Sequence, residues 1–331
     1  MWHDIPIQDL QFTCLVTESI RLPPFRGHVL RTALHEALRR SVCPFPASKP
    51  CAGCELRTSC PYPRTTGVGN DPSGDGRPLF VAWFDPATPD VTDVGGRMTL
   101  HMRLFGPAVS SLTYFVYAME SLSRFGIGLP DESGRRGRFV LERVSAMDRE
   151  GKRRIVFDRS GRRAEPLPVL TAGDVVCVGN EAADDFRTGV RVVLQAPLRI
   201  KREGRLTDRL PFGVLMRAVV RRLHDVYEAA TGKPWTFDVR GLLERAERVE
   251  TRRHDVRWFD YSRYSRTHGM RLKIGGMIGS VTYAGEVGEF LEWLRAGAFF
   301  AVGRSISFGL GRYDVVRPEE EQEAAVCAET N

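Results

Sequence analysis

The pattern of apolar and polar residues predicts strands and helices that alternate along the chain. The same order of elements occurs twice, once in each half. The first half predicts five elements, over residues 8–17 (strand), 28–40 (helix), 98–106 (strand), 110–125 (helix) and 138–147 (strand). The second half predicts five more, over residues 190–200 (strand), 212–230 (helix), 271–285 (strand), 287–297 (helix) and 312–316 (strand). The repeated order indicates two related units.

Two pairs of motifs support a tandem duplication. RFGIGL at 124–129 is matched by SFGLGRY at 307–313, and LPPFRGHVLRTAL at 22–34 is matched by LPFGVLMRAVV at 210–220. Phe125 and Phe308 are 183 positions apart, and Phe25 and Phe212 are 187 positions apart. Nearly equal offsets between independent landmarks are typical of an internal repeat.

Each unit fits the β-α-β-β-α-β order of a ferredoxin-like (RRM-like) domain, with one strand of each half not visible in the pattern. The expected fold class is therefore α+β, with two such domains in tandem, Gly-rich loops and a Cys-rich insertion. The predicted parts are an N-terminal domain (1–165) with the Cys-rich insertion (43–97), a linker (166–189), a C-terminal domain (190–317) and an acidic tail (318–331).

Charge is distributed unevenly around a formal net value of +7. Basic residues cluster at 134–138, 152–154, 199–205 and 263–273, whereas acidic residues concentrate in PEEEQE at the end of the chain. Such clusters favour a polyanionic partner such as RNA, with an ordinary solvated surface as the alternative. Antiparallel sheets of this class often leave one face open, and RNA-binding modules use that face.

The hydropathy pattern contains no apolar run of about 18 residues, so no membrane-spanning helix is expected. The first residues, MWHDIPIQDL, lack the basic and apolar regions of a signal peptide. We therefore expect a soluble cytoplasmic protein without a membrane partner.

Four of the seven cysteines lie within one short segment, at Cys43, Cys51, Cys54 and Cys60. A disulfide framework is not expected in a reducing cytoplasm. Four thiolates suit a closed, structural zinc site, and an iron–sulfur cluster or four free thiols are the alternatives. The expected role of an ion is to hold a long loop in place, so this site is not assigned to catalysis.

The motifs at the two ends of the chain resemble those of CRISPR-associated RAMP-superfamily endoribonucleases. The C-terminal resemblance rests on the stretch from Trp258 to Val316, and in particular on RYS at 263–265, Gly275-Gly276, Gly279, Tyr283 and FGLG at 308–311. PPFRGHVLRTALHEALRR and CAGCELRTSCPY in the first half also resemble members of this family. The resemblance is weakest at 61–97 and in the linker.

This resemblance implies tandem ferredoxin-like domains and cleavage of the repeat in a CRISPR precursor RNA, which gives mature guide RNAs. It also implies a reaction without a metal ion, in which a ribose 2′-hydroxyl attacks the adjacent phosphate and leaves a 2′,3′-cyclic phosphate. Other CRISPR effector subunits are possible partners. The residues that perform the reaction vary between members of the family.

The helix predicted at 28–40 offers candidate catalytic residues on its polar side. If Leu30, Ala33, Leu34, Ala37 and Leu38 face the core, then His28, Arg31, Thr32, His35 and Arg39 are expected to face outward. Histidine suits a general base or acid, and arginine suits the charge of the phosphorane. Two solvated histidines are the alternative. The candidate catalytic residues are His28, His35, Arg31 and Tyr264; further candidates are Tyr261, His254 and His268, and His224 is expected to face RNA or solvent.

Basic side chains and loop glycines are the candidate RNA ligands. Glycine permits positive φ and the close approach of a phosphate to backbone N–H groups, although a tight turn without a ligand explains it equally. The set comprises Arg26, Arg39, Lys201, Arg202, Arg217, Arg221, Arg263, Arg266, Gly303, Arg304, Gly309, Gly311 and Arg312.

Two other functions remain open at this point. A non-catalytic subunit of the same superfamily would bind guide RNA in an effector complex, with the same basic groove and Gly-rich loops but without a need for accessible histidines. A DNA-binding protein with a small zinc module is the third hypothesis, and it predicts a preference for duplex DNA over hairpin RNA.

Overall fold

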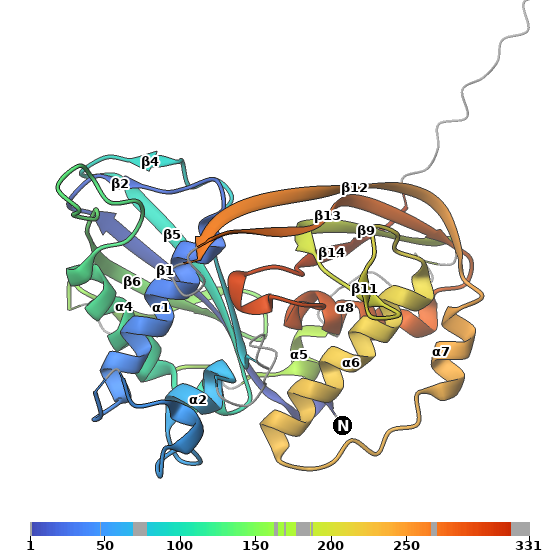
Figure 1. Cartoon of the computed structure of the whole chain (residues 1–331). Helices are drawn as coiled ribbons and strands as arrows, with labels where there is room; N and C mark the ends of the chain where they lie inside the picture. The colour runs from blue at the N-terminus through green and yellow to red at the C-terminus, as the bar shows by residue number, and fades with distance from the viewer. Residues whose placement is uncertain are drawn as a thin grey trace, which may run out of the picture.

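A computed structural model gives the structure of the protein and describes residues 2–46, 48–68, 78–161, 165–168, 170–176, 186, 188–265 and 270–318. For residues 262–265 and 270–273 it describes the backbone alone. Two antiparallel sheets, each covered by helices, lie side by side in the molecule (Figure 1).

The N-terminal sheet has the order β3-β5-β1-β6-β7, with β8 paired to the start of β1. Its strands are β1 (Pro6–Val16), β3 (Phe80–Phe84), β5 (Arg97–Phe105), β6 (Phe139–Met147), β7 (Arg153–Asp158) and β8 (Leu170–Thr171). Helices α1 (Arg26–Val42) and α4 (Leu112–Phe125) pack against each other and cover one face of this sheet (Figure 1).

The C-terminal sheet has the order β12-β13-β9-β14. Its strands are β9 (Gly189–Leu198), β12 (Glu250–Ser265), β13 (Met270–Ala284) and β14 (Tyr313–Val316). Helices α6 (Phe212–Thr231) and α8 (Leu291–Phe300) cover it from below in Figure 1. The long β12–β13 hairpin extends from this sheet across to the start of α1.

The two halves share one topology, which confirms the α+β, tandem ferredoxin-like prediction. In each half the order is β-α-β-β-α-β, and the third strand of the unit pairs with the second and first while the fourth lies beside the first. The strands that the sequence pattern failed to show are β3 and β12, the second strand of each unit.

Short elements connect these units. The strands β2 (Ile20–Arg21) and β4 (Val91–Thr92) pair with each other, as do β10 (Lys201–Arg202) and β11 (Arg205–Leu206). The remaining helices and 3₁₀ turns are η1 (Trp2–Asp4), η2 (Cys51–Gly53), α2 (Pro61–Thr66), α3 (Pro107–Ser110), α5 (Ala172–Val176), α7 (Arg240–Ala246), η4 (Gly288–Phe290) and η5 (Ile306–Phe308).

Two arginines donate to the last carbonyl groups of α8 and also join the two halves of the chain. Arg103 of β5 donates to the Ala298 and Phe299 carbonyls at 3.1 and 3.2 Å. Arg222 of α6, which is buried, donates to the Phe300 carbonyl at 3.1 Å and to the Pro78 carbonyl at 2.9 Å. Both therefore satisfy helix-end acceptors that have no partner inside the helix.

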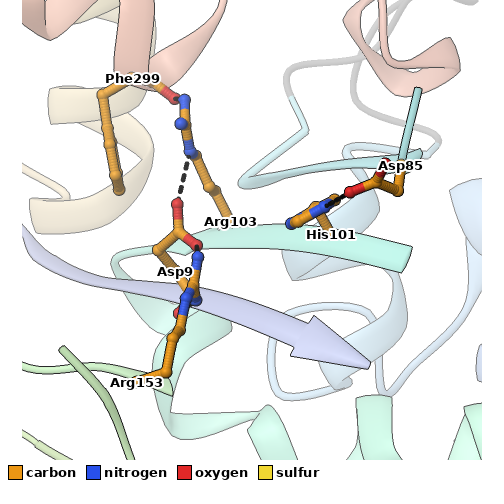
Figure 2. Close-up of polar contacts among 6 residues, drawn as sticks. All are labelled: Asp9, Asp85, His101, Arg103, Arg153 and Phe299. Atoms are coloured by element: carbon orange, nitrogen blue, oxygen red, sulfur yellow. Dashed lines mark hydrogen bonds and ion pairs between the residues drawn. The ribbon is translucent and has the colours of Figure 1, made fainter. Parts of the chain in front are cut away.

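The position of Arg103 is set by a buried carboxylate, Asp9 of β1 (Figure 2). Asp9 accepts from Arg103 Nε at 2.9 Å and from Arg153 Nη2 at 2.6 Å. Burial alone would raise the pKa of the Asp9 carboxyl, but the charges and hydrogen bonds of Arg103 and Arg153 outweigh burial, so this pKa is lowered. The same face of β5 carries His101, whose Nε2 lies 2.9 Å from Asp85 Oδ2.

In the described part of the chain, every helix is too short or too polar to cross a membrane.

Candidate active site

A cleft of about 1050 Å³ lies beside α1, between the loop that follows α4 and the part of β12 near the hairpin tip. Helix α1 contributes a row of side chains spaced four residues apart: His28, Thr32, Glu36 and Arg40. The loop at 125–130 and Arg136 form one wall, and residues 259–261 of β12 form another. His28 is the one histidine among the described residues that line the cleft.

The first turn of α1 is fixed by contacts from the C-terminal half. Phe25, which precedes the helix, stacks on Tyr261 of β12 with ring centroids 4.8 Å apart. A β-carbon at Gly27 would lie 3.0 Å from the carbonyl carbon of Phe308 and closer still to its oxygen. The loop containing Phe308 thus packs directly on the helix turn that carries His28, and only glycine permits that approach.

Arg31 joins the same contact. Its Nε donates to Ser307 Oγ at 3.0 Å, and its guanidinium lies 4.7 Å from the Phe308 ring centroid. Arg31 also lines the cleft with Arg40 and Arg136, against two carboxylates, Glu36 and Asp260. The excess of guanidinium groups suits an anionic ligand.

The expectation that His35 faces outward with His28 is wrong. His35 is 8% exposed, and its ring packs against Tyr62 of α2 and Phe80 of β3, with centroids 6.1 and 6.0 Å away. Burial, with a smaller contribution from the Arg31 charge, lowers the pKa of His35 to about 3. A neutral, buried imidazole on this side of α1 does not reach the cleft, so it is not a catalytic base or acid there.

Arg39 also lies away from the cleft. Its guanidinium donates to the Lys49 carbonyl at 2.6 Å, in the Cys-rich segment that folds back over this side of α1. The face of α1 that borders the cleft is therefore rotated from the expected one by about one residue, and it carries Glu36 and Arg40 in place of His35 and Arg39. The prediction of the core-facing side is confirmed for Leu30, Leu34, Ala37 and Leu38, whereas Ala33 is partly buried and lines the cleft.

The glycines of the C-terminal loop do not form a phosphate cradle. The N–H groups of Gly309 and Gly311 donate to the carbonyls of Ile306 and Pro197 at 2.8 and 3.1 Å. A β-carbon at Gly303, Gly309 or Gly311 would collide with a carbonyl oxygen of Arg199, Ala82 or Val302. The N–H groups of Gly309 and Gly311 are therefore already used within the chain, and all three glycines allow close packing; RNA binding by this loop stays a prediction.

The N-terminal Gly motif, in contrast, borders the cleft. Gly126 and Gly128 have φ values of +79° and +98°, and the loop lines the cleft from residue 125 to residue 130. The N–H groups of Gly126, Ile127 and Leu129 in this loop already donate to carbonyl groups of the protein. The motif therefore shapes the wall of the cleft rather than offering N–H donors at those three positions.

Several predicted RNA ligands already have protein partners. Arg26 pairs with Asp90 at 2.8 Å, and Arg217 pairs with Glu247 at 3.0 Å. Arg312 stacks over Trp83 at 4.4 Å from the ring centroid, and burial lowers its pKa to about 10. Arg312 is thus a structural residue, and Arg26 also donates to the Thr88 carbonyl, whereas the exposed ion pair of Arg217 costs little to exchange for phosphate.

The other predicted residues divide into exposed and undescribed ones. Lys201, Arg202 and Arg221 are exposed, and Arg304 is half-buried. The backbones of Arg263 and Tyr264 belong to β12 without a described side chain, and Arg266 and His268 lie outside the described residues. His254 accepts a hydrogen bond from the Leu210 N–H at 3.2 Å, and His224 lies 3.3 Å from Glu228.

The four clustered cysteines supply suitable donors for a structural metal ion, but their placement does not assemble a site. Within the part of the chain that the structure describes, no three Cys, His, Asp or Glu side chains converge closely enough to hold an ion. The thiols are nevertheless neighbours: Cys51 has a raised pKa, mainly because it is partly buried, and the other three cysteines add to this shift. The donor chemistry therefore fits zinc while the geometry does not.

The cleft residues that sequence reasoning missed include Glu36, Arg40, Phe125 and Arg136. The duplicated Gly motif was a usable signal for Phe125, since it marked the loop. Helix periodicity alone could not identify Glu36 and Arg40, because it fixes the buried side of α1 but not what covers each flank.

Comparisons with known proteins agree with this architecture. The family model for CRISPR-associated endoribonuclease Cas6 matches residues 192–313, and a family model described as an N-terminal domain matches residues 5–168. No curated protein sequence matches the chain.

Solved structures of Cas6 proteins share the fold over nearly the whole chain. A Cas6 product complex is 17% identical with a TM-score of 0.56, and covers 94% of this chain and 99% of its own. Cas6 of Thermus thermophilus is 15% identical with a TM-score of 0.51, with the same coverage of 94% and 99%. A partial Cas6-RT-Cas1–Cas2 complex is 14% identical with a TM-score of 0.57, and covers 97% of this chain and 48% of its own. Residues 192–313 of the chain thus match the family of CRISPR-associated endoribonucleases known as Cas6, and the chain shares the fold of solved Cas6 structures.

Proposed function

We propose that this protein cleaves CRISPR repeat RNA within precursor transcripts, at the cleft that His28 lines, and so produces guide RNAs. The observation that carries the proposal is the position of His28 in a cleft that three arginines also line, in a chain whose residues 192–313 match the Cas6 family. An RNA phosphate requires cationic surroundings, and histidine is the side-chain type that exchanges protons most readily near neutral pH.

The proposed reaction is an internal transesterification without a metal ion. The 2′-oxygen attacks the adjacent phosphorus, the bond from phosphorus to the 5′-oxygen breaks, and the products are a 2′,3′-cyclic phosphate and a free 5′-hydroxyl. A base removes the 2′-proton and an acid protonates the leaving 5′-oxygen. His28 performs one of these transfers, and the phenol of Tyr261, which also lines the cleft, is the candidate for the other.

Arginines in the cleft stabilise the charge that builds on the phosphorane. Arg31 is held by Ser307 and Phe308, so its position is set before RNA binds, as electrostatic stabilisation requires. Exposed cations outside the cleft, including Lys201, Arg202 and Arg221, would bind the RNA backbone and make affinity depend on salt.

The proposal is tested with the hairpin repeat RNA encoded beside the gene, in excess EDTA. A matched RNA carries a single 2′-deoxy nucleotide at the mapped cut. Cutting at one site, with a cyclic phosphate end and complete dependence on the 2′-hydroxyl, is the expected result. Tight binding without cutting would instead identify a non-catalytic guide-RNA subunit, and preference for duplex DNA would overturn both.

A further inference from the structure

Phe125, the last residue of α4, exposes an aromatic ring at the wall of the cleft. The residue is 59% exposed, although phenylalanine is normally a core residue, and it lines the same cleft as His28. The glycine that follows has φ +79°, and a β-carbon there would lie 2.8 Å from the Arg136 carbonyl oxygen. The chain therefore turns sharply after Phe125, and this leaves the ring at the end of the helix.

Arg40 of α1 completes this feature from the neighbouring helix. Its guanidinium carbon lies 4.5 Å from the centroid of the Phe125 ring, within the range of a cation–π interaction. Arg40 also pairs with Glu36 at 2.5 Å, but both side chains are about half exposed, so this pair contributes little and can open. An exposed ring and an available cation thus lie together at the cleft.

The contacts of Phe125 and Arg40 determine which kind of ligand can bind at this part of the cleft. The N–H groups of Gly126, Ile127 and Leu129 are already used, so at these positions the loop offers a ligand the Phe125 ring instead of a backbone anion site. An aromatic ring binds any nucleobase by its π-face, and a neighbouring arginine binds the attached phosphate. Bases inside a stem have both faces covered by neighbouring base pairs, whereas an unpaired base leaves a face open to the ring.

We propose that Phe125 and Arg40 form a stacking site for one unpaired nucleobase of the RNA, close to the phosphate that is cut. This inference rests on the proposed function, because it places the base next to the reacting phosphate at His28. The Phe125 ring stacks on the base, and Arg40 binds the phosphate that leads into the cleft.

The chain provides a matched control for each residue. Tyr117 lies on the same helix as Phe125 and is 60% exposed, but it does not line the cleft. Arg135 pairs with Asp131 four residues earlier, as Arg40 pairs with Glu36, and it also lies outside the cleft lining. Phe125→Ala is therefore compared with Tyr117→Ala, and Arg40→Gln with Arg135→Gln.

The test uses a hairpin RNA made uncleavable by one 2′-deoxy nucleotide, with 2-aminopurine placed in turn at each unpaired position beside the stem. Stacking quenches 2-aminopurine fluorescence. The wild-type protein should quench one position; Phe125→Ala should remove that quenching and weaken binding about 5- to 100-fold, as loss of one base–aromatic stack predicts. Phe125→Trp and Tyr117→Ala should keep the quenching and the affinity of the wild type. Arg40→Gln should weaken binding more than its control, Arg135→Gln.

Equal quenching and affinity in Phe125→Ala and Tyr117→Ala would overturn the proposal. Cleavage is measured separately on an unmodified RNA, so the two ideas fail in different ways. If the wild-type protein quenches one position but never cuts, the proposed function is wrong and the stacking site stands. If the protein cuts and no position depends on Phe125, the stacking site is wrong and the function stands.

Discussion

The carbonyl group of Phe308 lies so close to the α-carbon of Gly27 that no β-carbon fits between them. Gly27 precedes His28 on α1, and Phe308 belongs to the Gly-rich loop of the C-terminal half. The second Gly motif of the duplicated pair therefore holds the helix turn that bears the candidate catalytic residue, while the first motif borders the cleft on its other side. The cleft is complete only when both halves of the chain are docked.

Gly27→Ala should consequently disturb both folding and cleavage. Overpacking at this contact should lower the free energy of unfolding by about 1–3 kcal/mol, and a shift of the first turn should slow cleavage about 10- to 100-fold. Gly241→Ala is the control, since Gly241 is also the second residue of a helix but meets only the flexible end of Arg245. It should leave cleavage unchanged and stability unchanged or higher by up to about 1 kcal/mol. Identical behaviour of the two variants in urea unfolding and cleavage assays would contradict the contact.

Arg103→Met should weaken the junction between the halves. The change removes two hydrogen bonds to α8 and one of two cations beside buried Asp9, so the free energy of unfolding should fall by about 2–4 kcal/mol. Arg97→Met is the matched control on the same strand, because Arg97 pairs with Glu142 while 63% of its side chain is exposed. Arg97→Met should lower the free energy of unfolding by less than about 1 kcal/mol. Equal losses in urea titrations would show that the Arg103 contacts do not stabilise the junction.

The buried His35 should make the fold sensitive to acid. The pKa of His35 is lowered to about 3 in the folded chain, against 6.5 for an unperturbed histidine. Between these two values the histidine binds a proton in the unfolded state but not in the folded state. Stability from this residue is full above pH 6.5 and is lost as pH falls toward 3, by up to about 1.4 kcal/mol per pH unit. The pKa of Asp9 is also lowered, so the stability that Asp9 contributes is lost only below its ordinary pKa of 3.8. Between pH 4 and pH 6.5 the effect of His35 can therefore be measured without that of Asp9.

The measurement compares urea midpoints of wild-type and His35→Leu proteins between pH 7 and pH 4.5. The difference between the two proteins should shrink or reverse in favour of the variant as pH falls. A constant difference across this range would mean that His35 gains its proton in the folded state.

The sequence pattern predicted most elements of the fold, and the exceptions have physical causes. Strand β12 carries many charged residues because it is an exposed edge strand, so it shows no apolar alternation. Strand β3 is a five-residue apolar run with nearly every side chain buried, and so short a run has no distinguishing period. The predicted domain boundaries stay a prediction.

The site was less predictable than the fold. The seven-residue spacing of His28 and His35 predicts a shared polar side of α1, but Tyr62 of α2 and Phe80 of β3 pack against His35 and bury it. Both partners come from segments that no local pattern places beside α1. The Gly motifs were correctly singled out, yet their roles follow from hydrogen bonds and close contacts that only the folded chain reveals.

For the cysteine segment, we propose that Cys43, Cys51, Cys54 and Cys60 draw together around a structural ion, with zinc favoured over an iron–sulfur cluster. Elemental analysis of the purified protein should find about one zinc per chain, and removal by a chelator should lower the melting temperature without stopping cleavage outright. Visible absorbance and bound iron would instead identify a cluster. If the purified protein holds no metal, and if its melting temperature equals that of the Cys51→Ser variant, then neither a zinc ion nor an iron–sulfur cluster is bound here.

The most direct test of the account compares His28→Ala with His35→Leu in single-turnover cleavage of the repeat RNA, with affinity measured on the 2′-deoxy RNA. His28→Ala should cut at least about 100-fold more slowly while it binds as tightly as the wild type, because one proton transfer is lost. His35→Leu should cut at nearly the wild-type rate near neutral pH. Unchanged cutting by His28→Ala, or loss of cutting in His35→Leu with the fold intact, would contradict the placement of the active site at this cleft.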